Sequence, residues 1–147
     1  MSDNKQVIDG LNGLLADATV FYQKLRHYHW NVKGQHFFAL HARFEELYDG
    51  WAGSIDEIAE RILMIGGVPL HTLASVLKTA TIREDEGIPS ADAMIDAIIA
   101  DLRALHERAG AVIDRAEQAG DRGTVNLLDG LRDGMEKEIW MLGACRK

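Results

Sequence analysis

Four long stretches of the chain repeat their apolar residues at intervals of three and four, the period of an amphipathic helix. Only two prolines occur in 147 residues, and runs rich in Val, Ile and Thr are missing, so strands are not expected. The pattern predicts an all-α chain that forms a single domain over residues 1–147. The first predicted helix covers about residues 5–33. The apolar residues of the other three lie within 37–62, 93–116 and 125–142, and Ser90 is expected to be the N-cap of the third.

The connections between these stretches differ in length. Gly34 marks a short turn after the first stretch, and Gly120 and Asp121 mark another after the third. The second and third stretches are separated by a long segment in which residues 70–78 could form a short extra helix. One long crossover between short turns predicts a ferritin-like four-helix bundle rather than a simple up-and-down bundle.

Composition limits the function and the compartment. The net charge of −7, from 16 basic and 23 acidic residues, argues against nucleic-acid binding driven by overall charge. The single cysteine, Cys145, cannot form an intrachain disulfide, which favours a reducing cytoplasm. No secretory signal is expected in Met1–Gly10, and no stretch approaches the roughly 20 apolar residues of a membrane span.

Residues 28–61 carry five side chains that suit iron, zinc or manganese: His29, His41, Glu45, Asp56 and Glu60. Asp56 and Glu60 are four apart and lie side by side on one helix. His41 precedes Asp56 by 15 residues, about 22 Å at the rise of an α-helix. A metal–ligand bond is only about 2 Å long. If these residues share a metal ion, they must come from two chains.

Two copies of the second helix, packed antiparallel about a two-fold axis, would satisfy this requirement. The midpoint between His41 and the acidic pair falls near residue 50, where small residues allow close approach of two backbones: Gly50, Ala52 and Gly53. Symmetry would then create two identical sites, each with histidine from one chain and carboxylates from the other. His29 could join His41 across the short turn.

Each residue also has an ordinary explanation. Asp56 and Glu60 could lie on a solvated face with Arg61 or Arg43 as counter-charge. His29 could be a hydrogen-bonded core residue, while His41 and Glu45 could form a local ion pair worth about 0.3–0.5 kcal/mol. Only the joint geometry favours a metal site. Trp30 and Trp51 are expected to be packing residues, with one-electron donation near an oxidising metal as the less favoured alternative.

Several motifs together resemble the Dps family, the mini-ferritins known as DNA-binding proteins from starved cells. The resemblance covers nearly the whole chain and rests on segments in the family's order: His29–Gly34, Phe37–His41, Phe44–Glu45, Asp56–Arg61, Gly66–Pro69 and Ile139–Trp140.

This resemblance implies a hollow homododecamer with ferroxidase sites between subunits. Its implied ligands are His29 and His41 of one chain with Asp56 and Glu60 of another, and Glu45 at a position that can hold a second iron. The family oxidises Fe(II), typically with hydrogen peroxide, and stores Fe(III) mineral; zinc could substitute for iron.

Two features depart from the family's pattern. The lysine-rich N-terminal arm of some members is reduced here to Lys5, so DNA binding is expected to be weak or absent at physiological salt. For the three-fold pore that the resemblance implies for iron entry, the turn offers Glu117, Asp121, Arg122 and Asn126. Glu117 is the best candidate carboxylate among them, and Arg122 stands where an acid is expected. A DNA-compacting protein with a secondary metal site remains the alternative function, and a zinc-holding shell without turnover is a third.

Overall fold

The computed structural model describes residues 2–146 and consists of helices without strands over that range. The long helices are α1 (Ser2–Asn31), α2 (Phe37–Met64), α4 (Ala91–Gln118) and α5 (Arg122–Arg146), and the short helix α3 spans Leu73–Thr79. The predicted four-helix bundle with a short extra helix in its crossover is confirmed. None of the described helices combines the length and the apolar character needed to cross a membrane.

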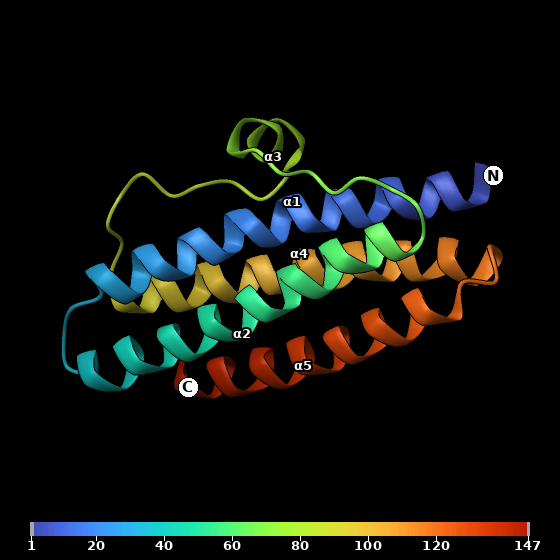
Figure 1. Cartoon of the computed structure of the whole chain (residues 1–147). Helices are drawn as coiled ribbons and strands as arrows, with labels where there is room; N and C mark the ends of the chain where they lie inside the picture. Colours follow the sequence, from blue (N-terminus) through green and yellow to red (C-terminus); the bar gives the residue numbers. More distant parts are fainter. Residues whose placement is uncertain (1, 147) are drawn as a thin grey trace.

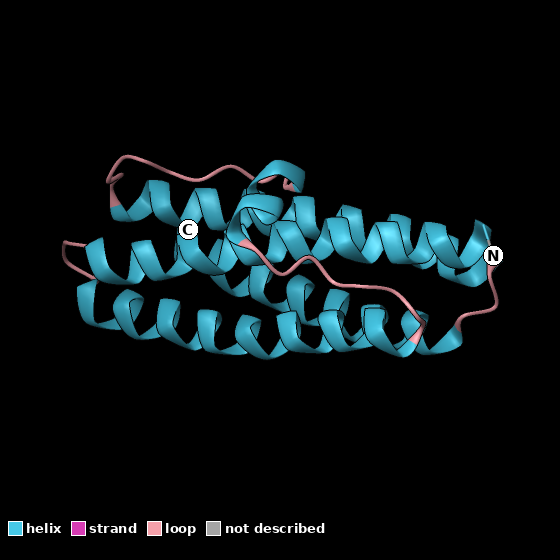
Figure 2. Ribbon diagram, turned by 45° about the horizontal axis from the view of Figure 1, so that its top comes forward, coloured by secondary structure: helices cyan, strands magenta, loops and turns pink. Residues whose placement is uncertain are grey.

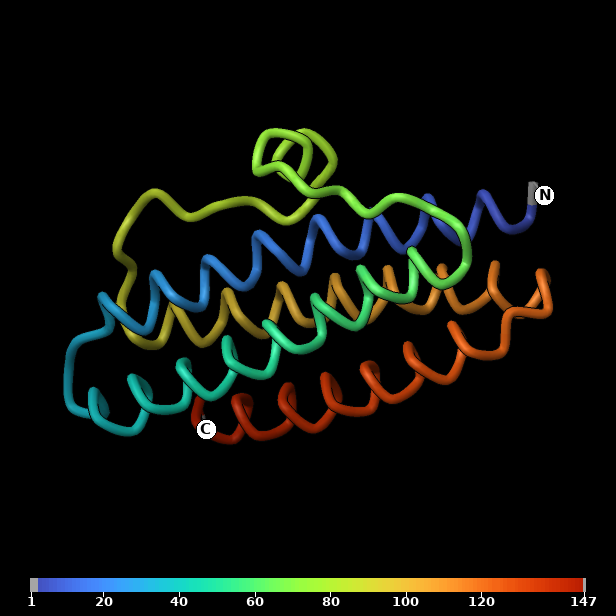
Figure 3. Tube along the Cα trace, in the orientation of Figure 1, coloured from blue at the N-terminus to red at the C-terminus, as the bar shows by residue number. Residues whose placement is uncertain are grey.

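The helices lie side by side along one common direction (Figure 1). Helix α2 runs antiparallel to α1, and α5 runs antiparallel to α4. Helices α2 and α4 point the same way, so the chain must return along the length of the bundle between them; α3 lies on this return path, over the outer side of α1 (Figures 1 and 3). Figure 2 shows that the rest of the crossover is loop.

The apolar stripes expected from the sequence form the core. Fully buried side chains come from all four long helices, and the largest among them include Phe21, Tyr28, Phe44 and Leu102. Burying a phenylalanine of this kind contributes about 1.5–3 kcal/mol to stability. Ser90 caps α4 as predicted, since its side chain accepts a hydrogen bond from the Ala93 N–H.

Asp17, a buried residue in the middle of α1, fastens the crossover to the bundle. Its carboxylate accepts hydrogen bonds from the Thr81 N–H (2.6 Å), the Thr81 hydroxyl (2.9 Å) and the Ile82 N–H (2.9 Å). Arg108 on α4 donates a further hydrogen bond of 2.8 Å. These four donors offset the cost of burying a charge that is only 2% exposed.

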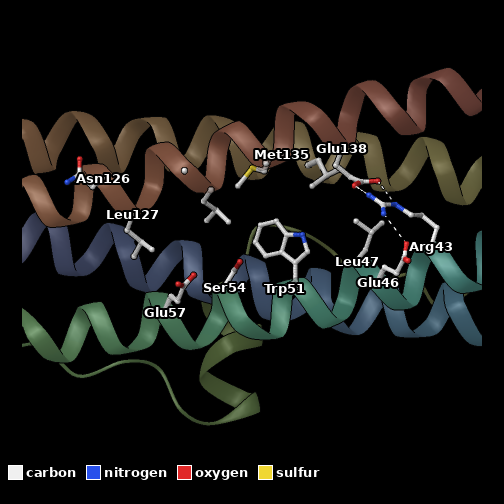
Figure 4. Close-up of a pocket in the computed structure, with 15 residues that line it drawn as sticks. Arg43, Glu46, Leu47, Trp51, Ser54, Glu57, Asn126, Leu127, Met135 and Glu138 are labelled. Carbon is white, nitrogen blue, oxygen red and sulfur yellow. Dashed lines mark hydrogen bonds and ion pairs between the residues drawn. The ribbon is translucent and has the colours of Figure 1, made fainter.

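A groove of about 580 Å³ separates parts of α2 and α5 (Figure 4). Three glycines in its lining, Gly50, Gly130 and Gly134, leave open space where other residues would place a Cβ. The Trp51 side chain projects into this groove from α2, and one end is closed by the ion pair between Arg43 and Glu138.

Candidate metal centre

The turn between α1 and α2 places His29 beside His41. Helix α1 ends with a hydrogen bond from the Val32 N–H to the Tyr28 carbonyl, and Gly34 follows with a φ of 116°. Residues with a Cβ rarely adopt this backbone conformation, so glycine allows the chain to reverse within a few residues. The reversal brings the last turn of α1 against the first turns of α2.

The two histidines are held by a reciprocal pair of hydrogen bonds. The Nδ1 of His29 lies 2.6 Å from the His41 carbonyl oxygen, and the Nδ1 of His41 lies 2.7 Å from the His29 carbonyl oxygen. The two rings stack with centroids 3.8 Å apart and planes 12° apart. Phe37 stacks on the His41 ring at 4.9 Å and extends this packing.

These hydrogen bonds determine which ring nitrogens are available to bind a metal. A carbonyl oxygen can only accept, so each Nδ1 must carry a proton. The neutral imidazole then has its lone pair on Nε2, as a metal ligand requires. His29 is 7% exposed, and its ring cannot turn freely without breaking both the stack and the hydrogen bonds. Both histidines are therefore preset as Nε2 ligands.

Glu45 lies next to this pair, one helical turn beyond His41. Its Oε1 is 3.9 Å from the Nε2 of His29. That separation is too long for a hydrogen bond. It is within the maximum of roughly 4 Å by which two ligands of one ion can be separated, so these two atoms could bind a common ion after a small approach.

Asp56 and Glu60 lie farther along α2, and both are exposed. The arginines considered as their counter-charges are engaged elsewhere. Arg43 pairs with Glu46 and Glu138, while Arg61 donates to Asp121 at 2.6 Å and to the Thr124 hydroxyl at 3.0 Å. Within residues 2–146, no group of three or more His, Cys, Asp and Glu side chains is arranged to hold a metal ion. One chain thus carries two separate groups of candidate ligands.

The two tryptophans differ from each other. Trp51 is buried and packs edge-on against Phe21 with ring centroids 5.4 Å apart, as expected for a packing residue. Trp30 is 56% exposed, so its prediction as a packing residue is wrong for this chain. The physical reason is its position directly after buried His29 on the same helix, because adjacent helical side chains point in different directions.

The turn between α4 and α5 carries the residues considered for iron entry. Glu117, Arg122 and Asn126 line a cavity of about 390 Å³ together with Asp129, which sequence reasoning missed. Asp129 follows Asn126 by three residues, so helical spacing on α5 was the available signal. Asp121 is occupied differently, because it accepts hydrogen bonds from the Thr124 N–H and hydroxyl. Burial acts to raise the pKa of the Asp121 carboxyl, but these bonds and Arg61 together hold it below its usual value.

Comparison with known proteins identifies the family. A family model described as a ferritin-like domain matches residues 8–147. The DNA protection during starvation protein of Brevibacillus brevis is 44% identical over 134 residues, which cover 91% of this chain and 90% of that protein. The chain belongs to the Dps family of ferritin-like proteins.

Solved Dps structures share the whole architecture. A crystal structure of a Dps protein from Bacillus brevis superposes with a TM-score of 0.98 at 41% identity and covers 100% of this chain and 99% of that one. A Dps protein from Vibrio cholerae O1, described as a member of a broad superfamily of ferritin-like diiron-carboxylate proteins, gives 0.96 at 36% identity, over 99% and 92% of the two chains. The bundle, the crossover and α3 are thus features that this chain shares with the Dps family.

Proposed function

We propose that this Dps chain oxidises Fe(II) to Fe(III), with hydrogen peroxide as the oxidant, and stores the product inside a hollow homo-oligomer. The observation that carries the proposal is the histidine pair: His29 and His41 are locked by backbone hydrogen bonds with each Nε2 available as a ligand. The donor set formed with Glu45, Asp56 and Glu60 suits iron. Family membership supports the same chemistry, since a Dps relative is described as a diiron-carboxylate protein.

The histidine and carboxylate side chains have different roles in this reaction. The imidazoles bind Fe(II) through Nε2, because Nδ1 of each ring is engaged with a carbonyl oxygen. The carboxylates supply hard, negatively charged oxygens that favour Fe(III) over Fe(II). Reduction of peroxide to water takes two electrons, and each Fe(II) provides one. Oxidising two irons together at one site therefore avoids the release of a hydroxyl radical.

The site is proposed to form between two chains, and the oligomer to be a dodecamer in the cytoplasm. The support for a shared site is the separation of ligands along α2: Asp56 and Glu60 are exposed and remote in sequence from His41, and their neighbouring arginines are paired elsewhere. A two-fold axis would join the histidines of each chain to the acids of its partner. Glu117 and Asp129, which line one cavity, are the proposed carboxylates of the iron entry route.

Anaerobic Fe(II) oxidation followed by stopped-flow absorbance tests this function. The wild-type protein is expected to oxidise Fe(II) rapidly after hydrogen peroxide is added, and His29→Ala to lose this fast phase. The matched control is His71→Ala, which removes an exposed histidine whose ring bonds only to the nearby Pro69 carbonyl. Equal rates in wild-type and His29→Ala proteins would contradict the proposal. Zinc binding without any Fe(II) oxidation would instead favour an inert metal-holding shell.

DNA protection is the second candidate, and the names of the curated relatives support it. The charges near the start of α1 do not favour DNA binding, because Lys5 pairs with Asp9 at 2.7 Å. Because the net charge is −7, we expect weak or absent DNA binding at physiological salt. A gel shift at low and moderate salt measures this, and tight binding at moderate salt would restore the DNA-compacting alternative.

A further inference from the structure

Two arginines project from one side of α2, and the metal-ligand candidates lie on a different side. Arg43 comes between His41 and Glu45 in the sequence, and Arg61 directly follows Glu60. The two arginines are 18 residues apart, about five whole turns of an α-helix, so they share one side. Each candidate on α2 is at least about 100° away from this side around the helix axis.

Both arginines bind to α5 or to the turn that precedes it. The Nε of Arg43 donates to one carboxylate oxygen of Glu138 at 3.1 Å, and its Nη2 donates to the other oxygen. Arg61 donates to Asp121 at 2.6 Å and to Thr124 at 3.0 Å. Among residues 2–146, the hydrogen bonds that join α2 to this part of the chain all come from these two arginines. Helix α2 is thus fastened to it near both of its ends.

The groove between α2 and α5 makes these two points important. The α2 residues that line it run from Arg43 to Glu57, one turn before Arg61 (Figure 4). Gly50, Gly130 and other small residues leave open space along the groove. Unfilled space provides no dispersion contacts across it. The position of α2 relative to α5 therefore depends more on the two arginines than on close packing.

Glu138 is a buried carboxylate to which the proposed reaction assigns no role. It is only 8% exposed, and Arg43 is its ion-pair partner. A buried carboxylate without a partner is costly, and contact through both oxygens also fixes the orientation of the guanidinium. Glu46 accepts a hydrogen bond from Arg43 as well, at 3.0 Å, but it is exposed and lies on α2 itself. Only Glu138 can use Arg43 to hold α2 against another helix.

The rotation of α2 about its axis affects the metal site, because the ligand candidates of one chain come from two helices. His29 lies on α1, whereas His41 and Glu45 lie on α2. The hydrogen bonds of the histidine pair hold one side of α2, and Arg43 holds another side two residues farther along. Rotation of α2 would change the 3.9 Å separation between the Glu45 Oε1 and the His29 Nε2. A displaced ligand lowers both metal affinity and rate.

We propose that Glu138, acting through Arg43, fixes the rotation of the first half of α2 and so positions His41 and Glu45 for the metal. Glu138 is a positioning residue, because it acts through Arg43 and not by contact with the metal. This inference rests on the metal site proposed above and concerns the histidine half of that site.

Titration of the assembled protein with Co²⁺ under anaerobic conditions, followed by visible absorbance, gives the first test. Glu138→Gln keeps the size of the side chain but removes its charge, and we expect it to lower the Co²⁺ affinity at least about 10-fold. Glu46→Gln is the matched control, since it removes the exposed partner of the same arginine, and should stay within about twofold of wild type. If Glu138→Gln does not assemble, Glu138→Asp keeps the charge, shortens the reach to Arg43 and should weaken binding in the same direction.

Mixed oligomers separate positioning from a general loss of stability. In the first mixture, Asp56→Ala/Glu138→Gln chains are reassembled with His41→Ala chains, so every intact site takes its histidines from a chain that lacks Glu138. In the second, Asp56→Ala chains are reassembled with His41→Ala/Glu138→Gln chains, so the histidines come from a chain that keeps Glu138. Each mixture contains the same three substitutions, and each parent protein is expected to be inactive alone. Stopped-flow Fe(II) oxidation with hydrogen peroxide should be at least about 10-fold slower in the first mixture than in the second.

Equal rates in the two mixtures, or equal Co²⁺ affinities in the wild-type, Glu138→Gln and Glu46→Gln proteins, would overturn the proposal. The two measurements also separate this inference from the function on which it rests. Fast wild-type oxidation with no effect of Glu138→Gln on rate or affinity defeats only this inference. Absence of wild-type oxidation together with weaker Co²⁺ binding in Glu138→Gln defeats the ferroxidase function and leaves the positioning role supported.

Discussion

The histidine pair and the acidic pair, the two groups of candidate ligands, differ in how firmly contacts within one chain hold them in place. His41 is fixed, with His29, by two backbone hydrogen bonds and a 3.8 Å ring stack. Asp56 and Glu60 are exposed, and the adjacent Arg61 turns to Asp121 instead of to them. The histidine group is complete before any metal or second chain arrives. The acidic group has no hydrogen-bond or ion-pair partner among residues 2–146.

This difference is consistent with the proposal that one metal site is divided between two molecules. A rigid pair of neutral ligands adds little ordering cost when metal binds, because its conformation is already set. Exposed carboxylates remain hydrated in the free chain, so they carry little desolvation cost there. In the proposed assembly they would meet the metal and the histidines of a second chain. Two consecutive residues illustrate the contrast: Glu60 is exposed to solvent, whereas Arg61 donates a hydrogen bond to Asp121 of the same chain.

The largest expected effect tests whether both groups bind the same metal. Asp56→Ala in the assembled protein should lower the affinity for Zn²⁺, used as a redox-inert probe, by at least about 10–100-fold. Glu57→Ala is the matched control, because it removes an exposed carboxylate from the next position on α2. Isothermal titration calorimetry measures both, and equal losses in the two variants would show that only general negative charge matters.

A smaller effect should separate the two groups by stability. His29→Ala removes the ring stack and leaves the His41 carbonyl without its donor, so we expect a loss of about 1–3 kcal/mol in the free energy of unfolding. Asp56→Ala should change it by less than about 0.5 kcal/mol, as for other exposed positions. Urea denaturation at one fixed protomer concentration measures both. A larger loss in Asp56→Ala would reverse the proposed asymmetry.

The smallest effect concerns pH and the carboxylate that holds Arg61. The Asp121 pKa is lowered in the folded state, so its charge stabilises the fold above its unfolded pKa of about 3.9, and this contribution disappears as pH falls through the folded value. Asp121→Asn should therefore be less stable than wild type near neutral pH and lose less stability on acidification. Urea titrations at a series of pH values measure the free energy of unfolding of both proteins. An equal decrease in the two proteins on acidification would contradict this prediction.

The fold could be predicted because its determinants are periodic and local. Apolar spacing, Gly34 and Ser90 indicated the helices and two of their boundaries, and the long gap between the second and third helices indicated the crossover. The last helix spans Arg122–Arg146 and so extends at both ends beyond the apolar residues at 125–142 that indicated it. The first residues of this helix have few apolar side chains, so the apolar pattern does not reach them. Asp121, which caps the N-terminus of the helix, was not recognised as a cap from the sequence.

For the candidate site, the sequence indicated which residues to consider but not how they are held. The hydrogen bonds that fix His29 and His41 are accepted by backbone carbonyls. Every residue has a backbone carbonyl, so no sequence motif could predict these bonds. The Asp17 cluster was missed for a related reason, since Thr81 and Arg108 are 64 and 91 residues away and come near only in the folded bundle. Long-range polar contacts of this kind depend on the tertiary structure and not on local spacing.

Mixed oligomers test the central claim, that histidines and acids of one metal site come from different chains. His41→Ala and Asp56→Ala proteins are each expected to lack fast peroxide-dependent Fe(II) oxidation. When equal amounts are unfolded together and reassembled, random pairing about a two-fold axis should leave about a quarter of the sites intact. Recovery of about that fraction of the wild-type fast phase is the predicted result. No recovery in mixed oligomers of confirmed composition would contradict the account.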